Sequence, residues 1–469
     1  MACIERIKIE GEDVIPAQVE GLVDVFAANN FVFSKARWVE DNEVSTCKIC
    51  SNKFNQLRRK HHCRQCGRVL CSKCCSQKVP LPQLGLPDPE RVCEVCKPVT
   101  ECITKSRSSH QSFQLEAVQG LTELVMDSAG MKKVIELGGL QTLVFLSKQE
   151  NEQIRKHVMC GLHTLASHEP LLGYLVKAGG IKATCRILSC AKEEEEQTVI
   201  AGISTLMIFC KSVDFKSQAL QDGALQPILA LCNMNETIAL LAVSTLSLIV
   251  QDPRTHAAVI ENNNKALPRI IAFTNARDEQ MQEVSLNVLA HLSTGTEWHK
   301  NRLVQEDFTC GRCLLKVLKT NTRNMQIVFN AACTVANLAS SEQSQSALQE
   351  HMEIMCNLLS TYDEHTDLLL HISRAVANFS KFPQNASRLV QHLPNVIAIS
   401  LKSETDAIKF QGMRCLFNLL SHMARPTIEA LMKDGASELL EGISDIPGVH
   451  DAIQTAILKN IPEVTSPPI

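Results

Sequence analysis

The chain has 469 residues, of which 45% are hydrophobic and 4% aromatic, and its formal net charge is −3 at pH 7. A chain of this length has room for more than one domain. The slight negative charge argues against a nucleic-acid-binding protein, and the scarcity of aromatic residues favours stacked helices over a β-sandwich. No apolar run reaches the length that is needed to cross a membrane as a helix.

Residues 1–37 contain one short run of apolar residues at helical spacing, namely Val19, Leu22, Val23 and Phe26. Pro16 suits the first turn of a helix, and the pattern predicts an amphipathic helix that ends near Asn30. We expect this helix to pack on another part of the protein. Because its polar positions include Glu20 and Asp24 rather than Lys or Arg, a helix on a membrane surface is the weaker interpretation.

The most informative stretch follows, because its cysteines occur in four CxxC pairs. The eight residues are Cys47, Cys50, Cys63, Cys66, Cys71, Cys74, Cys93 and Cys96. A CxxC turn lets two sulfurs reach one metal ion, so four pairs can complete two tetrahedral zinc sites. A segment this short cannot bury enough apolar surface to fold alone, and a structural zinc ion contributes roughly 10–16 kcal/mol.

Two other uses of these cysteines are weaker interpretations. Disulfides suit secreted proteins, but we expect no signal peptide, and the remaining cysteines are mostly scattered through apolar helical patterns. A catalytic zinc ion needs an open coordination position, and eight cysteines leave none. Cys75 is left over, and we interpret it as a non-ligand that could compete with Cys74.

A basic run overlaps the cysteine pairs. Residues 53–64 contain five Lys or Arg side chains and no acid. His61 and His62 could be metal ligands, as in RING-type fingers, but they are surplus once eight sulfurs are available. The run is either a solvated face or, in the interpretation that we favour, a phosphate pocket. Arg and His side chains held beside zinc ligands make charge-assisted hydrogen bonds to phosphate with little loss of entropy.

Three short motifs in this region resemble those of the FYVE zinc fingers. They are WVED at residues 38–41, RKHHCR at 59–64 and RVC at 91–93. The resemblance covers residues 38–97. It implies a cross-braced finger that binds phosphatidylinositol 3-phosphate on endosomal membranes.

The resemblance also implies roles for individual residues. One zinc ion would bind Cys47, Cys50, Cys71 and Cys74, and the second would bind Cys63, Cys66, Cys93 and Cys96. Arginines would hold the phosphates, histidines would bond phosphate or ring hydroxyls, Asp41 would accept from hydroxyls, and Trp38 would fix Asp41. The complete lipid-binding set is Trp38, Asp41, Arg59, Lys60, His61, His62, Arg64 and Arg91.

One feature departs from the family pattern. FYVE fingers insert a hydrophobic loop tip into the bilayer, and the matching residues here are Gln56 and Leu57. A single leucine contributes only about 1–2 kcal/mol of insertion energy. We therefore expect one finger to bind membranes weakly and to need a second contact, either in a homodimer or through a protein partner.

Residues 98–113 are rich in Lys, Arg, Ser and Thr without periodicity, and they predict a linker. From residue 114 the chain repeats with spacings of 41 to 44 residues. The first marker, at a turn of small residues, falls at Gly139, Gly180, Ala224, Ala266, Cys310, Glu353, Asn395 and Ala436. The second marker, an apolar residue that closes a helix, falls at Leu165, Leu206, Leu246, Leu292, Leu338, Phe379 and Leu419.

Each period holds three apolar helical stretches, and its length resembles that of armadillo repeats, with HEAT-like repeats as the alternative. Because a single repeat cannot bury its apolar faces, we expect about eight of them to stack as an α-solenoid over residues 114–463. The resemblance implies a right-handed superhelix. Residues 440–461 would cap it, and residues 464–469 would form a tail. The predicted fold class is therefore mainly α, with a small two-zinc finger in front.

Asparagines on the third helix of armadillo repeats hold the backbone of an extended peptide. Asn337, Asn378 and Asn418 occupy that place directly before the second marker, whereas earlier repeats carry Thr or His. These positions allow a peptide groove in the last three complete repeats. The alternative, to which we give slightly more weight, is that these asparagines satisfy the ends of neighbouring helices.

The sequence contains no P-loop, GxSxG or HExxH motif and no paired carboxylates that the repeats would assemble, so no catalytic residue is predicted. The favoured function is a non-enzymatic adaptor, cytoplasmic and peripheral on early endosomal membranes, that binds protein partners through its solenoid. The alternative is a zinc-dependent ubiquitin ligase, or a protein-binding finger without lipid selectivity. The motifs at residues 38–41 and 91–93 favour the adaptor.

Overall fold

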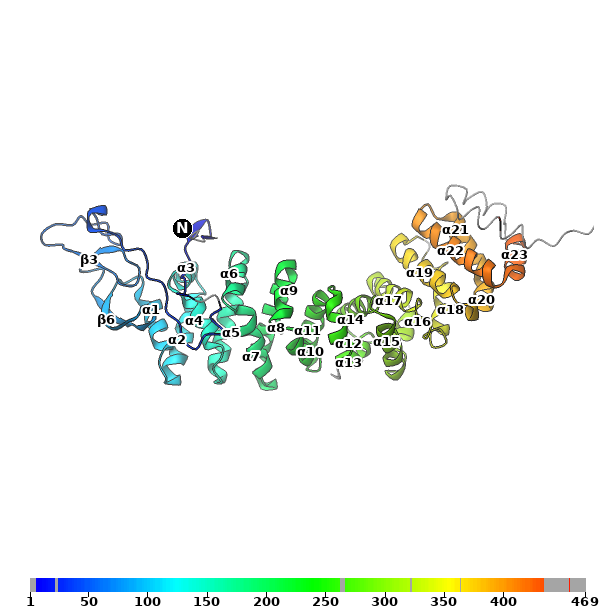
Figure 1. Cartoon of the computed structure of the whole chain (residues 1–469), viewed down its shortest axis with the longest axis horizontal. Helices are drawn as coiled ribbons and strands as arrows, with labels where there is room; N and C mark the ends of the chain where they lie inside the picture. The colour runs from blue at the N-terminus through cyan, green and yellow to red at the C-terminus, as the bar shows by residue number, and fades with distance from the viewer. Residues whose placement is uncertain are drawn as a thin grey trace, which may run out of the picture. The chain divides into compact units, whose positions relative to one another are not determined.

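The computed structural model describes residues 6–21, 24–261, 266–320, 323–362, 364–433 and 455. The chain divides into two units, Met1–Leu248 and Ile249–Ile469. Three two-stranded sheets come first in the sequence, and helices follow one another through the rest of the described chain (Figure 1). The mainly helical prediction is confirmed.

The finger contains two antiparallel strand pairs: β3 (Lys60–His62) with β4 (Val69–Cys71), and β5 (Gln77–Leu81) with β6 (Leu86–Val92). The turn between β3 and β4 needs a glycine. Gly67 has a φ of +70°, and a Cβ there would lie 2.2 Å from the carbonyl oxygen of Arg37. The missing side chain lets the segment that carries Trp38 cross this turn, where the N–H of Val39 donates to the carbonyl of Gly67 at 3.1 Å.

The N-terminal segment is not the amphipathic helix that its apolar spacing predicts. After β1 (Ile7–Ile9) and β2 (Glu12–Val14), its described residues form a loop with turns in which Val19 pairs with Phe33. Two members of the predicted helix, Leu22 and Val23, lie outside the described residues. The prediction was wrong for the described residues, because Glu20 and Phe26 donate to Val32 and to the Asp24 side chain of the same segment rather than to a helical turn.

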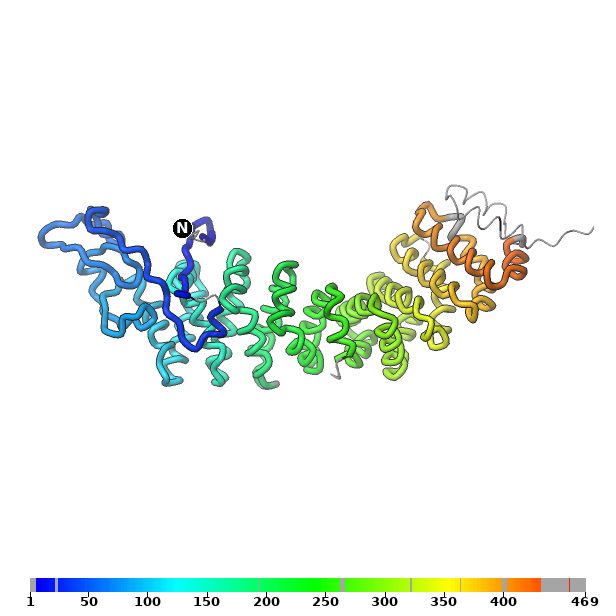
Figure 2. The backbone as a smooth tube through the Cα atoms, in the orientation of Figure 1, coloured from blue at the N-terminus to red at the C-terminus, as the bar shows by residue number. Residues whose placement is uncertain are grey.

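We call residues 15–37 the strap, because they connect the finger to the first repeats. The N–H of Ala17 donates to the carbonyl of Ile135 at 3.0 Å, and its carbonyl accepts from Nε2 of Gln141 at 2.8 Å. On the finger side, the N–H of Phe33 donates to the carbonyl of Gln83 at 2.8 Å. Figure 2 shows this dark blue segment running beside the first helices of the chain.

Two glycines let the strap approach successive repeats. A Cβ on Gly138 would lie 2.1 Å from the ring of Phe33, and a Cβ on Gly179 would lie 2.8 Å from Cβ of Phe26. Both glycines have positive φ values, of +95° and +94°, at the junction between two helices. The strap therefore depends on the same left-handed turns that reverse the chain between helices.

The predicted linker at residues 98–113 is largely helical. Helix α1 (Lys97–Ser106) buries Val99 and Ile103 and packs on α2 (Gln111–Leu124) and on β5. Two of the polar residues that suggested a linker, Thr100 and Ser106, are buried on the same face as these apolar side chains. Tertiary packing on both sides stabilises this helix despite its weak apolar pattern.

The repeats of the first unit continue with α3 (Ser128–Leu137), α4 (Gly139–Leu146), α5 (Glu152–Ala166), α6 (Leu172–Lys177), α7 (Gly180–Cys190), α8 (Glu196–Lys211), α9 (Val213–Gln221), α10 (Leu225–Leu231) and α11 (Glu236–Ile249). Their apolar faces form a closed core in which, for example, Leu143, Leu162 and Leu206 are fully buried. The long third helices pack on one another, α2 on α5 and α5 on α8.

The second unit contains α12 (His256–Ile260), α13 (Ala266–Phe273), α14 (Glu279–Leu292), α15 (Glu297–Thr309), α16 (Cys313–Lys319), α17 (Met325–Leu338), α18 (Gln349–Leu358), α19 (Thr366–Ser380), α20 (Pro383–Leu389), α21 (Leu393–Lys402), α22 (Asp406–His422) and α23 (Ala424–Lys433). Helix α17 packs on α14 and α19, and α19 packs on α22. The last repeat marker, Ala436, the predicted cap and the tail lie outside the described residues, apart from residue 455. None of the described helices is long and apolar enough to span a membrane.

Replacing Gly138 by Ala should destabilise the first unit more than the same change at Gly223. Both residues have positive φ, which costs an Ala side chain about 1–2 kcal/mol. At Gly138 the new methyl group also collides with Phe33, which adds about 1–3 kcal/mol, whereas no described atom lies within 4 Å of the Cβ position at Gly223. Chemical unfolding of the two variants measures the difference. Equal destabilisation of the two variants would show that the strap does not pack against Gly138.

Candidate metal centres and phosphate pocket

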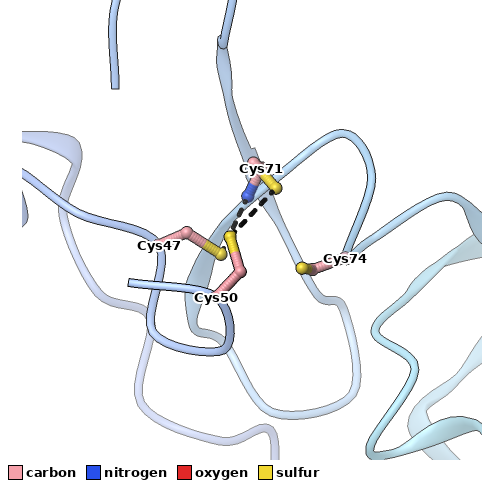
Figure 3. A group of neighbouring side chains, drawn as sticks. All are labelled: Cys47, Cys50, Cys71 and Cys74. Atoms are coloured by element: carbon pink, nitrogen blue, oxygen red, sulfur yellow. Dashed lines mark hydrogen bonds between the residues drawn. The ribbon is translucent and has the colours of Figure 1, made fainter. Parts of the chain in front are cut away.

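Cys47, Cys50, Cys71 and Cys74 form the first cysteine group. Their four sulfur atoms lie within 4.8 Å of one another and point toward a common centre (Figure 3). The sulfurs of Cys50 and Cys71 are 3.8 Å apart, and the edge of a zinc–thiolate tetrahedron with bonds of about 2.3 Å is also about 3.8 Å. The donor set and its spacing fit a structural zinc ion.

The second group consists of Cys63, Cys66, Cys93 and Cys96, whose sulfurs also lie within 4.8 Å of one another. Three of the four are buried, and Cys66 is half-buried. Each group combines two CxxC pairs that are separated in the sequence, as the FYVE resemblance implies. The chain therefore has two zinc centres, each made of four cysteines, in a cross-braced arrangement.

The same local turn builds all four CxxC pairs. The carbonyl of each pair's first cysteine accepts a hydrogen bond from the N–H four residues later, at 2.8 to 3.0 Å. The donors are Ser51, Gly67, Cys75 and Lys97. This tight turn puts both sulfurs of a pair on one side, so that two pairs can enclose one ion.

Backbone donors prepare these sulfurs for a metal ion. The backbone N–H and the side-chain amide of Asn52 lower the pKa of Cys50 to about 6, so this thiol is largely ionised at neutral pH. The N–H of Cys71 points at the sulfur of Cys47 at 3.4 Å, and the N–H of Cys93 points at that of Cys63 at 3.2 Å. These contacts stabilise thiolates, which are the form that binds zinc.

Cys75 is fully buried but belongs to neither group. Its thiol lies in hydrogen-bonding range of Cys63, and this contact, with burial, raises the pKa of Cys75 above its usual value. A neutral thiol at this place suits a donor to a ligand sulfur rather than a ligand.

The predicted lipid-binding residues gather around β3 and the strands beside it. The rings of Trp38 and His62 stack with centroids 3.9 Å apart and planes 12° from parallel. Nε2 of His62 donates to the carbonyl of Val39 at 2.8 Å, which fixes the ring. The guanidinium of Arg64 lies 5.1 Å from the centre of the Trp38 ring, within the range of a cation–π contact.

A second set of contacts holds the rest of the pocket. Nζ of Lys60 donates to the carbonyl of Asp41, and Asp41 lies 3.8 Å from Nε2 of His62. Arg91 donates to the carbonyl of Cys75 at 3.0 Å. Burial, together with the positive charges of Arg91 and Arg59, lowers the pKa of His61, which is therefore neutral near pH 7 and can both donate and accept.

The structure thus brings the predicted lipid-binding residues together, with Arg59 exposed at the edge. It adds one residue that the sequence analysis missed. Oε2 of Glu90, on β6, lies 3.3 Å from Nε of Arg64. An acid directly before the RVC motif gave no signal in the sequence, because Glu90 comes beside Arg64 only through the fold, in which the N–H of Arg64 donates to the carbonyl of Arg91 at 2.8 Å.

Gln56 and Leu57 lie at the tip of an exposed loop. The Leu57 side chain is 97% exposed. Oδ1 of Asn55 accepts from the backbone N–H groups of Leu57 at 3.0 Å and Arg58 at 2.8 Å, so the turn is held from inside. A leucine presented in this way has no apolar contact within the described protein to lose on entering a bilayer.

The three asparagines of the predicted peptide groove make contacts inside the second unit. Asn337 is buried and donates to the carbonyl of Ala290 at 3.2 Å and to Oγ of Ser293 at 3.0 Å. Asn378 donates to the carbonyl of Ala336 at 2.7 Å. Asn418 donates to Oγ of Ser380 at 3.0 Å. These contacts are of the alternative kind, in which the asparagines satisfy the neighbouring helix, and they leave fewer amide donors for a peptide.

Comparisons with known proteins agree with both parts of this description. Residues 37–102 match the family model described as the FYVE zinc finger. The chain is 44% identical over 78 residues to the lateral signaling target protein 2 homolog of Brugia malayi, a stretch that covers 16% of this chain and 13% of that protein. It is 39% identical over 82 residues to a putative 1-phosphatidylinositol 3-phosphate 5-kinase of Drosophila melanogaster, covering 18% and 4%. It is 38% identical over 128 residues to the vacuolar protein sorting-associated protein 27 of Debaryomyces hansenii, covering 26% and 17%.

Two solved structures resemble the helical part. An engineered protein from the Northeast Structural Genomics Consortium matches with a TM-score of 0.60 at 18% identity, over 77% of this chain and 88% of that one. UNC-45 from Drosophila melanogaster also matches with a TM-score of 0.60, at 14% identity, over 78% and 51%. The chain carries a FYVE-type zinc finger ahead of an armadillo-type α-solenoid. The matched stretches span less than a fifth of each sequence relative, so these matches identify the finger alone.

Replacing Cys66 by Ser should remove one of the two zinc ions, because three sulfurs hold the ion less tightly than four. Replacing Cys75 by Ser should leave both ions in place, since Cys75 belongs to neither group. Zinc content of the full chain after dialysis against a weak chelator measures both outcomes. Loss of an ion from the Cys75 variant would make that residue a ligand.

Proposed function

We propose that this chain is a non-enzymatic adaptor that binds phosphatidylinositol 3-phosphate through its finger and a protein partner through its solenoid. The observation that carries the first half is the group of basic and aromatic side chains around β3. There a neutral His61 and His62, which stacks on Trp38, directly precede Cys63 of the second zinc centre in the chain, and Arg64 follows it. His61 is close enough to Arg91 and Arg59 to feel their charge. A rigid group of donors with excess positive charge suits a phosphorylated ring more than it suits a neutral ligand.

Each donor has a place in this proposal. Arg59, Arg64 and Arg91 bind the phosphates, and Lys60 lies nearer the second phosphate. His61 donates to phosphate or to a ring hydroxyl. Asp41 accepts from ring hydroxyls, since its side chain is mostly exposed. In the free protein, Arg64 forms an ion pair with Glu90. We expect the lipid headgroup to replace this carboxylate as the partner of Arg64.

The second half of the proposal concerns where the protein acts. Residues 38–97 serve as the lipid-binding module, and residues 114–463 serve as the protein-binding module. A finger of this class takes the chain to early endosomal membranes from the cytoplasmic side. Because its tip offers one leucine, a homodimer or a membrane-bound partner of the solenoid supplies the second contact. Similarity to a protein named for vacuolar sorting supports this place of action.

Replacing Arg64 by Ala should weaken binding to phosphatidylinositol 3-phosphate vesicles at least about tenfold, the value of one charge-assisted hydrogen bond. The matched control is Arg68→Ala, which removes the same charge from an exposed finger residue that forms no ion pair with a carboxylate among the described residues. Co-sedimentation of the full chain with vesicles that carry each singly phosphorylated lipid gives both affinities. Equal binding to all of them, or equal losses in both variants, would leave a finger without lipid selectivity.

Replacing Leu57 by Asp should reduce vesicle binding by about tenfold while leaving zinc content unchanged. The reason is that the substitution removes roughly 1–2 kcal/mol of insertion energy and adds a charge near acidic lipids. A soluble headgroup should still bind, since Leu57 lies outside the phosphate pocket. Unchanged vesicle affinity would remove the insertion role.

A further inference from the structure

Two arginines of the second unit occupy equivalent positions on successive third helices. Arg374 lies on α19 and Arg414 lies on α22, one turn before Asn378 and Asn418. Each arginine contacts the asparagine of the preceding repeat. Nη1 of Arg374 donates to Oδ1 of Asn337 at 2.8 Å, and Nη2 of Arg414 donates to Oδ1 of Asn378. We call Arg374 and Arg414 the arginine row.

No carboxylate neutralises the row among the residues that the structure describes. Arg374 otherwise contacts Nδ1 of His371 at 3.0 Å and the sulfur of Cys333 at 3.7 Å, and its buried Nε has no partner there. Helix α17 carries no Asp or Glu. Helices α19 and α22 carry none beyond their first turns. The row is therefore a local excess of positive charge.

Other arginines of the same unit behave differently. Arg302 pairs with Glu306 at 2.8 Å, and Arg388 pairs with Glu353 at 2.7 Å. Arg312 also pairs with a carboxylate, that of Glu350. These three arginines thus have acidic partners, whereas Arg374 and Arg414 have none among the described residues.

Partial burial makes the missing counter-charge costly. Both arginines are half-buried, and burial together with the charge of Arg374 lowers the pKa of Arg414. His371 adds no charge, because burial and Arg374 lower its pKa to about 4. A neutral asparagine oxygen satisfies one donor of a guanidinium but does not neutralise it, so a bound anion would regain much of the lost solvation energy.

We propose that the arginine row binds an extended acidic segment of a partner protein. This inference rests on the proposed protein-binding role of the solenoid and names the chemistry of its partner. Carboxylates fit because a guanidinium offers them two parallel donors. Phe410 and Phe417, which are 44% and 43% exposed, lie one turn to either side of Arg414 and would contact apolar side chains of the same segment.

The spacing of the row defines the segment further. Packed helices lie about 8–10 Å apart, so the two guanidinium groups on neighbouring helices are separated by a similar distance. A chain in the polyproline II conformation brings residues i and i+3 to one side at about 9 Å. The expected partner therefore has two acidic residues three positions apart, with an aromatic or aliphatic residue between or beside them.

The test uses the full chain and a fluorescein-labelled peptide of about twelve residues, made of Glu, Pro and Phe with Glu at every third position. Fluorescence polarisation should show binding that weakens as salt is added. The same peptide with Gln in place of Glu should bind at least about tenfold more weakly. This comparison needs no variant. Equal binding of the two peptides would overturn the proposal.

Variants then locate the site. Arg374→Gln combined with Arg414→Gln should weaken binding of the Glu peptide at least about tenfold. The matched control, Arg302→Gln with Arg388→Gln, removes the same charge from the same unit and should bind normally. Circular dichroism checks that both remain folded. Loss of binding in both doubles, or binding of phosphatidylserine vesicles by the row in place of the peptide, would overturn the assignment to an acidic protein segment.

The lipid and peptide experiments can fail separately. In a three-component sedimentation, phosphatidylinositol 3-phosphate vesicles should carry the labelled peptide down only when the full chain is present. Arg64→Ala should reduce sedimentation of the peptide as much as it reduces sedimentation of the chain, but should leave the polarisation signal unchanged. The row variant should lose the polarisation signal while the chain itself still sediments. Peptide that binds equally well to the row variant must occupy another basic surface, and the row would then have no assigned ligand.

Discussion

The last cysteine of the second zinc centre is also the residue that starts the helical part of the chain. Cys96 stands at the N-cap of α1, and the first turn of that helix contains the N–H of Lys97, which donates to Cys93. Helix α1 then packs on β5 of the finger and on α2 of the repeats. Cys96 therefore connects the second zinc centre to the helical part of the chain, because it is both a zinc ligand and the N-cap residue of the helix that packs on α2. Zinc binding stabilises the finger, and through α1 it also fixes the end of the stack on which later repeats of the first unit pack.

The strap gives the first unit a second connection of a different kind. It bonds to the finger through Gln83 and to the repeats through Ile135 and Gln141, mostly by main-chain groups. Main-chain bonds place few demands on sequence, and the clearest demand beneath the strap is that Gly138 and Gly179 have no side chain. Gly138 is the clearest case, because one residue both reverses the chain with a positive φ and leaves room for Phe33. Turn geometry and strap packing are satisfied at the same position.

Charge is balanced differently in the two candidate binding surfaces. In the finger, Glu90 partly neutralises Arg64 in the free protein, and the headgroup would compete with an internal carboxylate. On the third helices of the second unit, Arg374 and Arg414 meet only neutral acceptors among the described residues. The first arrangement favours selectivity, since a weak anion gains little by replacing Glu90. The second favours capture of any extended acidic segment of suitable spacing, so partner choice there depends on apolar contacts with residues such as Phe410.

Local patterns in the sequence determined the zinc finger and the repeats. Four CxxC pairs define their own turns, and a period of about 42 residues defines helices that must stack to bury their faces. Tertiary structure decided the features that depend on remote partners. The strap has the spacing of a helix, yet its described residues form a loop, in which Glu20 and Ser34 pair within the strap and Ala17 bonds to α3 and α4. Residues 97–106 have the composition of a linker yet form α1, because they are packed on two sides. Asn337 has the position of a peptide-binding residue, yet its amide is used by Ala290 and Ser293 of the preceding repeat. The sequence identifies a hydrogen-bond donor but not the acceptor that it contacts. Only the fold brings a remote acceptor within hydrogen-bonding distance.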